Sequence, residues 1–237
     1  MELSILIVIL ITSIIQGQIG VGLLAFGTPI LLIMGVDYLE AMSILLPCSL
    51  ALSLIQIIEG RSFIRSISQR DFLLLLPATA FGFLVWHSFK EELEMKPIIG
   101  LVMLATAILI NHEKLSRKLK VLLNEKSALS LVFIGLIHGL TNMGGSFLTL
   151  LSSAKLDNKK NIRTYVALGY LLMAIVQISA AKITNPANFD LQSNYILIAV
   201  FGYLAIAKKI FNKFNEDSYK LTIQYAVISL AVIALAF

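Results

Sequence analysis

The sequence predicts an all-α polytopic membrane protein built from two inverted repeats, each a re-entrant broken-helix hairpin followed by three transmembrane helices. Three observations support this fold class. The chain of 237 residues is 58% hydrophobic and only 14% charged, with a mean hydropathy of +0.88, whereas a soluble globular domain is about 25% charged. Two long uncharged runs are interrupted by glycines. Lysine and arginine are divided very unevenly between the two sides that this topology defines.

The first repeat, residues 1–111, begins with an uncharged run at 3–36. This run has 34 residues, although one spanning helix needs about 20 and rarely exceeds about 25. A glycine-rich break at 17–22 divides it. The run is therefore either two complete spans with almost no connection or one re-entrant hairpin of two half-helices. Three spans are expected after it, at about 38–58, 72–89 and 95–111.

The second repeat, residues 127–237, has the same order of elements after a basic linker at 112–126, which is expected to be cytoplasmic. Its uncharged run is too short for two crossings, at 28 residues, and is broken near its middle. Broken helices at matching positions in two halves indicate the substrate site of a transporter. The expected elements are a hairpin at 127–154 and spans near 162–181, 191–207 and 221–237.

The charges in the loops decide between the topologies. If all eight elements crossed the membrane, Lys and Arg on the two sides would total 10 and 9, but if the two broken elements enter and leave on one side, the totals are 16 and 3. Cytoplasmic loops usually carry the excess, so the re-entrant arrangement is favoured. Each half then has three spans, which turns the second half upside down, and both termini of this cell-membrane protein lie outside.

The helix breaks are the expected substrate site. The second half-helix of each hairpin should begin in the membrane with unpaired N–H groups at the positive end of its dipole, and such ends bind anions without a fixed cation. Half-helix carbonyls can also hold Na⁺. The predicted substrate-binding residues are Gln18, Gly20, Val21, Gly22 and Leu23 at the first break, and His138, Thr141, Asn142, Gly144, Gly145 and Ser146 at the second.

Several of these residues have a second interpretation besides substrate binding. The glycines could instead let helices pack closely. Asn142 and Ser146 could bind oxyanion oxygens or cap the half-helix. His138 could donate to an anion, relay a proton, or be a neutral buried side chain bonded to a carbonyl. Gln56 and Gln177 could line the path or hold helices together. Cys48 could line the path or be an inert buried thiol.

The break residues resemble the TauE/SafE sulfite exporter family of membrane permeases. The first repeat carries the family's glycine-rich break, proline, glycine and alanine in order, and the second its paired-glycine version; the residues are Gly17, Gly20, Gly22, Pro29, Gly35 and Ala41, then Gly135, His138, Gly139, Asn142, Gly144, Gly145 and Leu148. The family's run of three or four glycines at the first break and the proline after the second are not present here. The resemblance implies transport of sulfite, thiosulfate or organosulfonates, or of small carboxylates in divergent members.

The expected function is secondary transport of a small anion, bound at mid-membrane between the two half-helix N-termini, with alternating access. A passive anion channel and a small-carboxylate permease are the alternatives. An enzyme is not expected, because the sequence lacks HExxH, GxSxG with a matched His, phosphate-loop and dinucleotide motifs. No metal, cofactor or nucleic acid is expected. The expected partners are the substrate and the lipid bilayer; a coupling ion, H⁺ or Na⁺, and a homodimer remain open.

Overall fold

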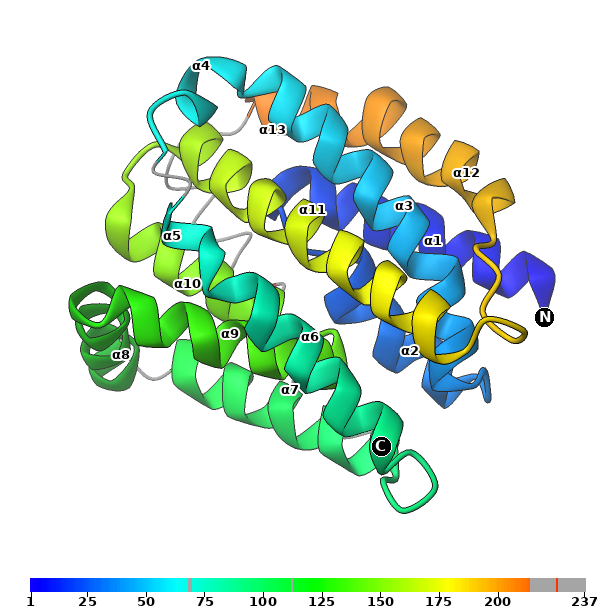
Figure 1. The fold of residues 1–237 in the computed structure, drawn as a ribbon. Helices are drawn as coiled ribbons and strands as arrows, with labels where there is room; N and C mark the ends of the chain where they lie inside the picture. The colour runs from blue at the N-terminus through cyan, green and yellow to red at the C-terminus, as the bar shows by residue number, and fades with distance from the viewer. Residues whose placement is uncertain (68–69, 112, 214–224, 226–237) are drawn as a thin grey trace.

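The computed structural model describes residues 1–67, 70–111, 113–213 and 225, and all regular structure in this part of the chain is helical (Figure 1). The α-helices and the π- and 3₁₀-segments (η) are, in order, α1 (Glu2–Ile19), η1 (Leu23–Gly27), α2 (Thr28–Ile33), α3 (Tyr38–Glu59), α4 (Arg61–Ile64), α5 (Arg70–Leu73), α6 (Leu75–Ser88), α7 (Met95–Asn111), α8 (Glu113–Glu125), α9 (Ser127–Thr141), α10 (Gly144–Lys155), α11 (Lys159–Thr184), η2 (Ser193–Tyr195), α12 (Ile196–Phe201), η3 (Gly202–Ala207) and α13 (Lys208–Lys213).

Among the described residues, four helical segments are long and apolar enough to cross a membrane: α1, α3, α11 and the continuous segment Ser193–Lys213. The last three coincide with predicted spans. The helices at the other two described spans, α6 and α7, are apolar but have only 14 and 17 residues, short of the roughly 20 that a straight crossing needs. The predicted span at 221–237 lies outside the described residues, apart from Tyr225.

Both predicted interruptions are real breaks in the helices. The helix α1 ends at Gly20, which has a φ of 82°, and α9 ends at Asn142, which has a φ of 64°. Both residues therefore adopt the left-handed conformation that commonly ends a helix. Each N–H donates to the carbonyl four residues earlier, at 2.8 Å: Gly20 to Gln16 and Asn142 to His138. The two breaks are thus 122 residues apart and have the same local geometry.

The first break does not divide its run into two half-helices of equal length. The leading helix α1 has 18 residues, about 27 Å of helix, which nearly matches a hydrocarbon core of about 30 Å. The returning arm consists of the short segments η1 and α2, with 5 and 6 residues. The sequence predicted the position of the break along the chain. The distance of the break from the N-terminal start of α1 follows from where that helix begins, at Glu2.

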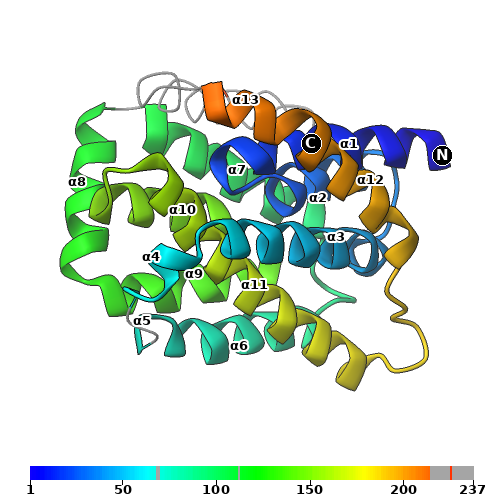
Figure 2. The same ribbon diagram turned by 90° about the horizontal axis from the view of Figure 1, so that it is seen from above.

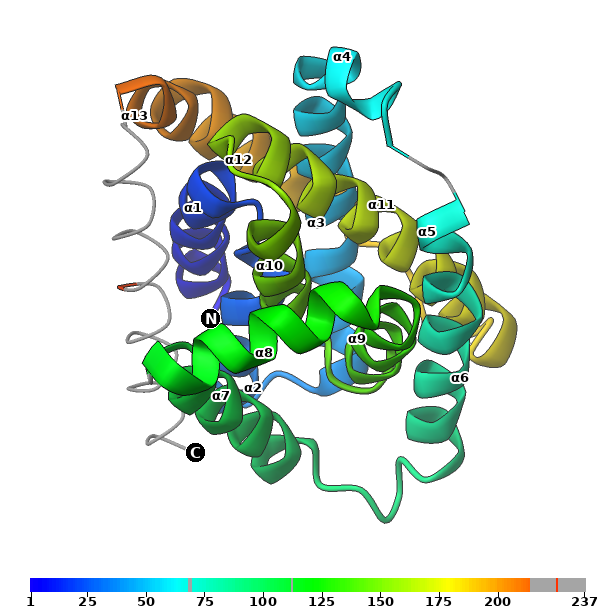
Figure 3. The ribbon, with the colours of Figure 1, turned by 90° about the vertical axis from the view of Figure 1, so that its left-hand side faces the viewer.

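Both hairpins return to the end of the bundle from which they start (Figure 1). The helix α1 runs away from the N-terminus and α2 comes back toward it, whereas α9 and α10 start and finish at the opposite end. We call this opposite end, which carries α4, α5, α8, α13 and the start of α11, the basic end; Figure 3 views the molecule from it. The end with the N-terminus and the loops at 34–37, 89–94 and 185–192 is the N-terminal end.

The basic linker predicted at 112–126 contains a helix, α8 (Glu113–Glu125). The helix α8 is amphipathic and packs on α7, α9 and α10. Its segment Arg117–Leu123 is bent by 104° from α9, so α8 lies across the basic end (Figure 3).

At the centre of the bundle α3 packs along α11 (Figure 2), while α9 lies against α6, and α1 against α12 and η3. Glycines permit the closest of these contacts. A Cβ at Gly139 would overlap the carbonyl oxygen of Thr79 on α6, and one at Gly17 would overlap the Cβ of Ala207. For these two glycines the helix-packing interpretation is therefore confirmed.

Candidate functional site

A chain of buried hydrogen bonds shapes the second break. Gln177 of α11 donates from Nε2 to the His138 carbonyl at 3.1 Å and to Asn142 Oδ1 at 2.8 Å. Asn142 in turn donates to the hydroxyl of Thr28 at 3.3 Å, which ties this break to the returning arm of the first hairpin. The Thr141 hydroxyl accepts the N–H of Met143 at 3.1 Å. Thr141 and Asn142 thus hold the shape of the break with their side chains.

Beside these bonds lies a group of buried polar atoms that have no hydrogen-bond partner among the described residues. They are both ring nitrogens of His138, the hydroxyls of Ser146 and Tyr170, and Oε1 of Gln177. The His138 ring meets the Tyr170 ring edge-on, with centroids 5.4 Å apart. A Cβ at Gly145 would overlap the Tyr170 hydroxyl, so that hydroxyl lies against the first turn of α10. Buried polar groups are nearly always paired in proteins, and each one that is not needs an explanation.

At the first break the carbonyls that end α1 already have donors. The Gln16 carbonyl accepts from Nε2 of Gln56 at 3.0 Å, and the Gly17 carbonyl accepts from Arg163 at 3.1 Å. The predicted donor Gln18 is turned to the Ala207 carbonyl of η3 at 2.8 Å. The amide of Leu23, another predicted donor, is taken by the Gln16 side chain at 3.1 Å.

The glycines that open the returning arms are required by the preceding arms. A Cβ at Gly22 would overlap the backbone of Gln16, and one at Gly144 would overlap His138. Gly22 and Gly144 are 122 residues apart, and so are Gln16 and His138, the residues that a Cβ at each glycine would overlap. Gly20 packs on Val166 of α11, and Val21 is buried next to it.

Both breaks pack against α11. The first lies beside Arg163 and Val166, and the second lies beside Tyr170 and Gln177. The arms that return from the two breaks, η1 and α10, are in contact, and Asn142 donates to Thr28 across them.

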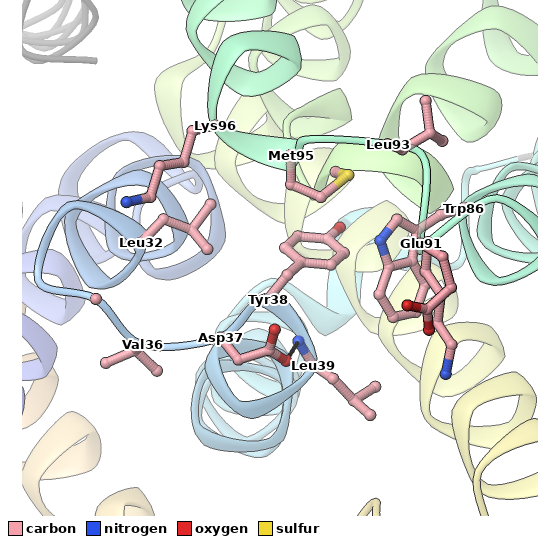
Figure 4. Close-up of a pocket in the computed structure, with 12 residues that line it drawn as sticks. Leu32, Val36, Asp37, Tyr38, Leu39, Trp86, Glu91, Leu93, Met95 and Lys96 are labelled. Atoms are coloured by element: carbon pink, nitrogen blue, oxygen red, sulfur yellow. Dashed lines mark hydrogen bonds between the residues drawn. The ribbon is translucent and has the colours of Figure 1, made fainter.

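A cavity of about 540 Å³ opens at the N-terminal end (Figure 4). Tyr38 and Trp86 form part of its wall, and their rings meet edge-on at 5.0 Å. The charged residues that line it are Asp37, Lys90, Glu91 and Lys96, two of each sign. The Tyr38 hydroxyl donates to the Leu140 carbonyl at 3.1 Å. Because Leu140 precedes Asn142 by two residues, Tyr38 stands between this cavity and the second break.

The model of one protein family, described as Sulfite exporter TauE/SafE, matches residues 5–235 of the chain. The chain belongs to the TauE/SafE family. TauE/SafE proteins are transporters integral to the membrane, in agreement with the apolar helices described above. Comparisons with curated proteins and with solved structures find no match.

In this TauE/SafE protein the two predicted glutamines are placed alike. Gln56 and Gln177 each reach from a long helix to the last turn of a hairpin arm, at the Gln16 and His138 carbonyls. They hold helices together, as one of the two interpretations expects, although Oε1 of each has no partner among the described residues. Cys48 is a buried free thiol in α3.

A cluster of charges at the basic end was not predicted from sequence. The Glu59 carboxylate accepts from Arg163 at 3.0 Å and from the Tyr203 hydroxyl, and it pairs with Lys208 at 2.8 Å. The Arg163 guanidinium stacks on the Phe211 ring at 3.7 Å. Sequence reasoning counted Arg163 and Lys208 among the loop charges and did not consider Glu59. It also missed Tyr170, because an aromatic residue in an apolar span usually belongs to the core.

Proposed function

We propose that this protein is a secondary transporter of a small anion that binds at the second break, with sulfite, thiosulfate or an organosulfonate as its substrate. The observation that carries the proposal is the set of buried, unpaired polar groups on His138, Ser146 and Tyr170 beside the start of α10. The family description supports a sulfur oxyanion.

The chemistry of this group suits an anion. The hydroxyls of Ser146 and Tyr170 can donate, and so can one nitrogen of a neutral His138. The amides of Gly144 and Gly145 lie in the first turn of α10, at the positive end of its dipole. An oxyanion accepts several such bonds at once. A binding site of neutral donors also fits the absence of charge from both hairpin runs.

A sodium site receives less support from the same geometry. Na⁺ would need free carbonyl oxygens where the leading arms end. The Gln16 and Gly17 carbonyls already accept from Gln56 and Arg163, and the Leu140 carbonyl accepts from Tyr38. These donors neutralise the ends that would otherwise attract a cation, so the balance at the breaks favours anions.

The architecture that we propose for transport is the pair of inverted repeats, with two re-entrant hairpins and both termini outside the cell. Corresponding capping bonds support it: Gln56 and Gln177 are 121 residues apart, and their acceptors Gln16 and His138 are 122 apart. The N-caps of α3 and α11, Asp37 and Asn158, are also 121 apart. The opposite directions of the two hairpins agree with an inversion (Figure 1).

Alternating access would then begin at the cavity of Figure 4. It gives an anion a route from the N-terminal end to Tyr38, and rotation of the Tyr38 ring away from Leu140 would open the second break to that cavity. The other end of the route is closed by the cluster around Glu59.

The test compares Ser146→Ala with Ser152→Ala in purified protein. Both serines are buried in α10, but the Ser152 hydroxyl already donates to the Thr149 carbonyl. Loss of one hydrogen bond to a charged ligand costs about 1.5–3 kcal/mol, so we expect Ser146→Ala to bind sulfite roughly tenfold or more weakly and Ser152→Ala to bind it as wild type does. Equal affinities for sulfite, thiosulfate and methanesulfonate in both variants would refute the proposed site. Saturable counterflow in liposomes separates a carrier from a passive pore.

A further inference from the structure

We propose that Arg163 forms a second binding position for the transported anion, beside the first break, and that Glu59 occupies this position in the present structure. The inference rests on the proposed function, because it concerns the same small anion. It adds a fixed positive charge to a route whose hairpins carry none.

Arg163 is placed as a binding residue would be. Its side chain is 4% exposed, and a buried guanidinium is strongly unfavourable without partners. One terminal nitrogen donates to the Gly17 carbonyl in the last turn of α1, and the other donates to Glu59. The Phe211 ring covers its face. The Nε atom has no hydrogen-bond partner among the described residues, so the group retains a donor for a further oxygen.

Glu59 is the exchangeable partner. Its side chain is 19% exposed, far more than that of Arg163. Its carboxylate pairs with Arg163 of α11 and Lys208 of α13 and accepts a hydrogen bond from the Tyr203 hydroxyl of η3. If the carboxylate withdraws, two cations and a hydroxyl are left without an anion. A sulfur oxyanion can replace it, because an arginine binds two oxygens of such a group with parallel hydrogen bonds.

This position lies on the far side of the route from the cavity. Figure 3, which views the basic end, shows α1, α3, α11 and α13 meeting there. The Glu59 contacts join three of these elements, so exchange of Glu59 for the anion would loosen the closed end as the anion arrives. The proposed position at the second break, where Tyr170 follows Arg163 by seven residues or about 10 Å along α11, is the preceding position on the route.

The test uses Glu59→Gln in a Ser146→Ala background, in which binding at the second break is weakened. The glutamine keeps an acceptor for Tyr203 but no longer competes as an anion for Arg163. We expect at least tenfold tighter equilibrium binding of sulfite than in Ser146→Ala alone. Asp190→Asn is the matched control, because Asp190 forms an exposed pair with Lys182 at the other end; it should change affinity less than twofold.

A second variant shows whether Arg163 carries the gain. The double change Glu59→Gln with Arg163→Gln removes both members of the buried pair and leaves no uncompensated buried charge from it, so we expect it to fold, as a cooperative thermal transition would show. It should lose the gained affinity. An affinity for Glu59→Gln no better than that of Asp190→Asn, or full retention of the gain in the double variant, would overturn the proposal. Either of these results would leave the proposed function standing, provided that wild type binds sulfite and Ser146→Ala does not. If wild type binds no anion, the proposed function itself fails.

Discussion

Single hydrogen-bonding side chains from the long helices hold each break in place. At the second break Gln177 serves two acceptors, and at the first Gln56 serves one. The Gln16 and His138 carbonyls also accept the amide that ends each helix. The side-chain oxygen of Asn142 therefore depends on Gln177 more than either carbonyl depends on its glutamine.

This difference predicts unequal costs for Gln177→Leu and Gln56→Leu. Gln177→Leu leaves the buried Asn142 oxygen without this donor and should lower the free energy of unfolding by about 1–3 kcal/mol, whereas Gln56→Leu should cost about 0.5–1.5 kcal/mol. Unfolding in detergent measures both. Ser179→Ala, at an exposed position of α11, should stay within about 0.5 kcal/mol. An equal or larger effect of Gln56→Leu would contradict this account of the breaks.

The candidate site was predictable from sequence only in part. Glycine runs inside uncharged stretches predict where the backbone breaks, because few other residues permit those turns. They do not predict which distant side chain faces the break. Arg163 reaches the first break at Gly17, which is 146 residues earlier in the chain. Tyr170 reaches the second break at Gly145. No local spacing in the sequence encodes either contact.

At the scale of the helices, close approach of α6 and α9 depends on small residues. A Cβ added at Gly135 would overlap Leu75 and Ala78, and a Cβ added at Gly82 would overlap the Leu136 carbonyl. With little hydrophobic driving force between helices in lipid, such close packing supplies much of their association. The helices α6 and α9 therefore form one unit that joins the second hairpin to the first half of the chain.

Gly139→Ala tests this packing. The new methyl would overlap the Thr79 carbonyl oxygen, a backbone atom that cannot move alone, so we expect a loss of about 1–3 kcal/mol of stability. Gly35→Asn provides the comparison: Gly35 has a φ of 86° and open space around it, and asparagine tolerates that conformation, so the change should be nearly neutral in thermal unfolding. A neutral Gly139→Ala would show that α6 and α9 can separate without cost.

Hydropathy predicted where the helices lie better than it predicted how long they are. The helices α3 and α11 contain the uncharged stretches 41–58 and 164–181 and extend past them at both ends, with Asp37 and Asn158 as N-caps. The break in the first run was placed correctly, but the extension of α1 to 18 residues was not foreseen. Glycine at 17 was counted as part of the break, although a glycine that packs on Ala207 is accepted within a helix.

At the scale of the whole molecule, the proposed topology makes a direct prediction about the two ends of the bundle. Glu2 begins α1 at the N-terminal end, and Asn158 is the N-cap of α11, whose start lies at the basic end (Figure 1). Cysteines introduced one at a time at Glu2 and Asn158, in a Cys48→Ala background, should react with an impermeant thiol reagent from opposite sides of the membrane. Labelling of both from one side would exclude the re-entrant, inverted arrangement.

The offset between the two proposed anion positions has an electrical consequence. Seven residues of α11 separate Arg163 from Tyr170, which is about 10 Å along the axis and about a third of a hydrocarbon core of about 30 Å. A full crossing of one elementary charge is worth about 2.3 kcal/mol per 100 mV, so a monovalent anion that moves between the two positions would exchange roughly 0.8 kcal/mol with a membrane potential of about 100 mV. In the proposed topology, which puts the basic end in the cytoplasm, a potential that is negative inside would favour movement of the anion from Arg163 toward Ser146.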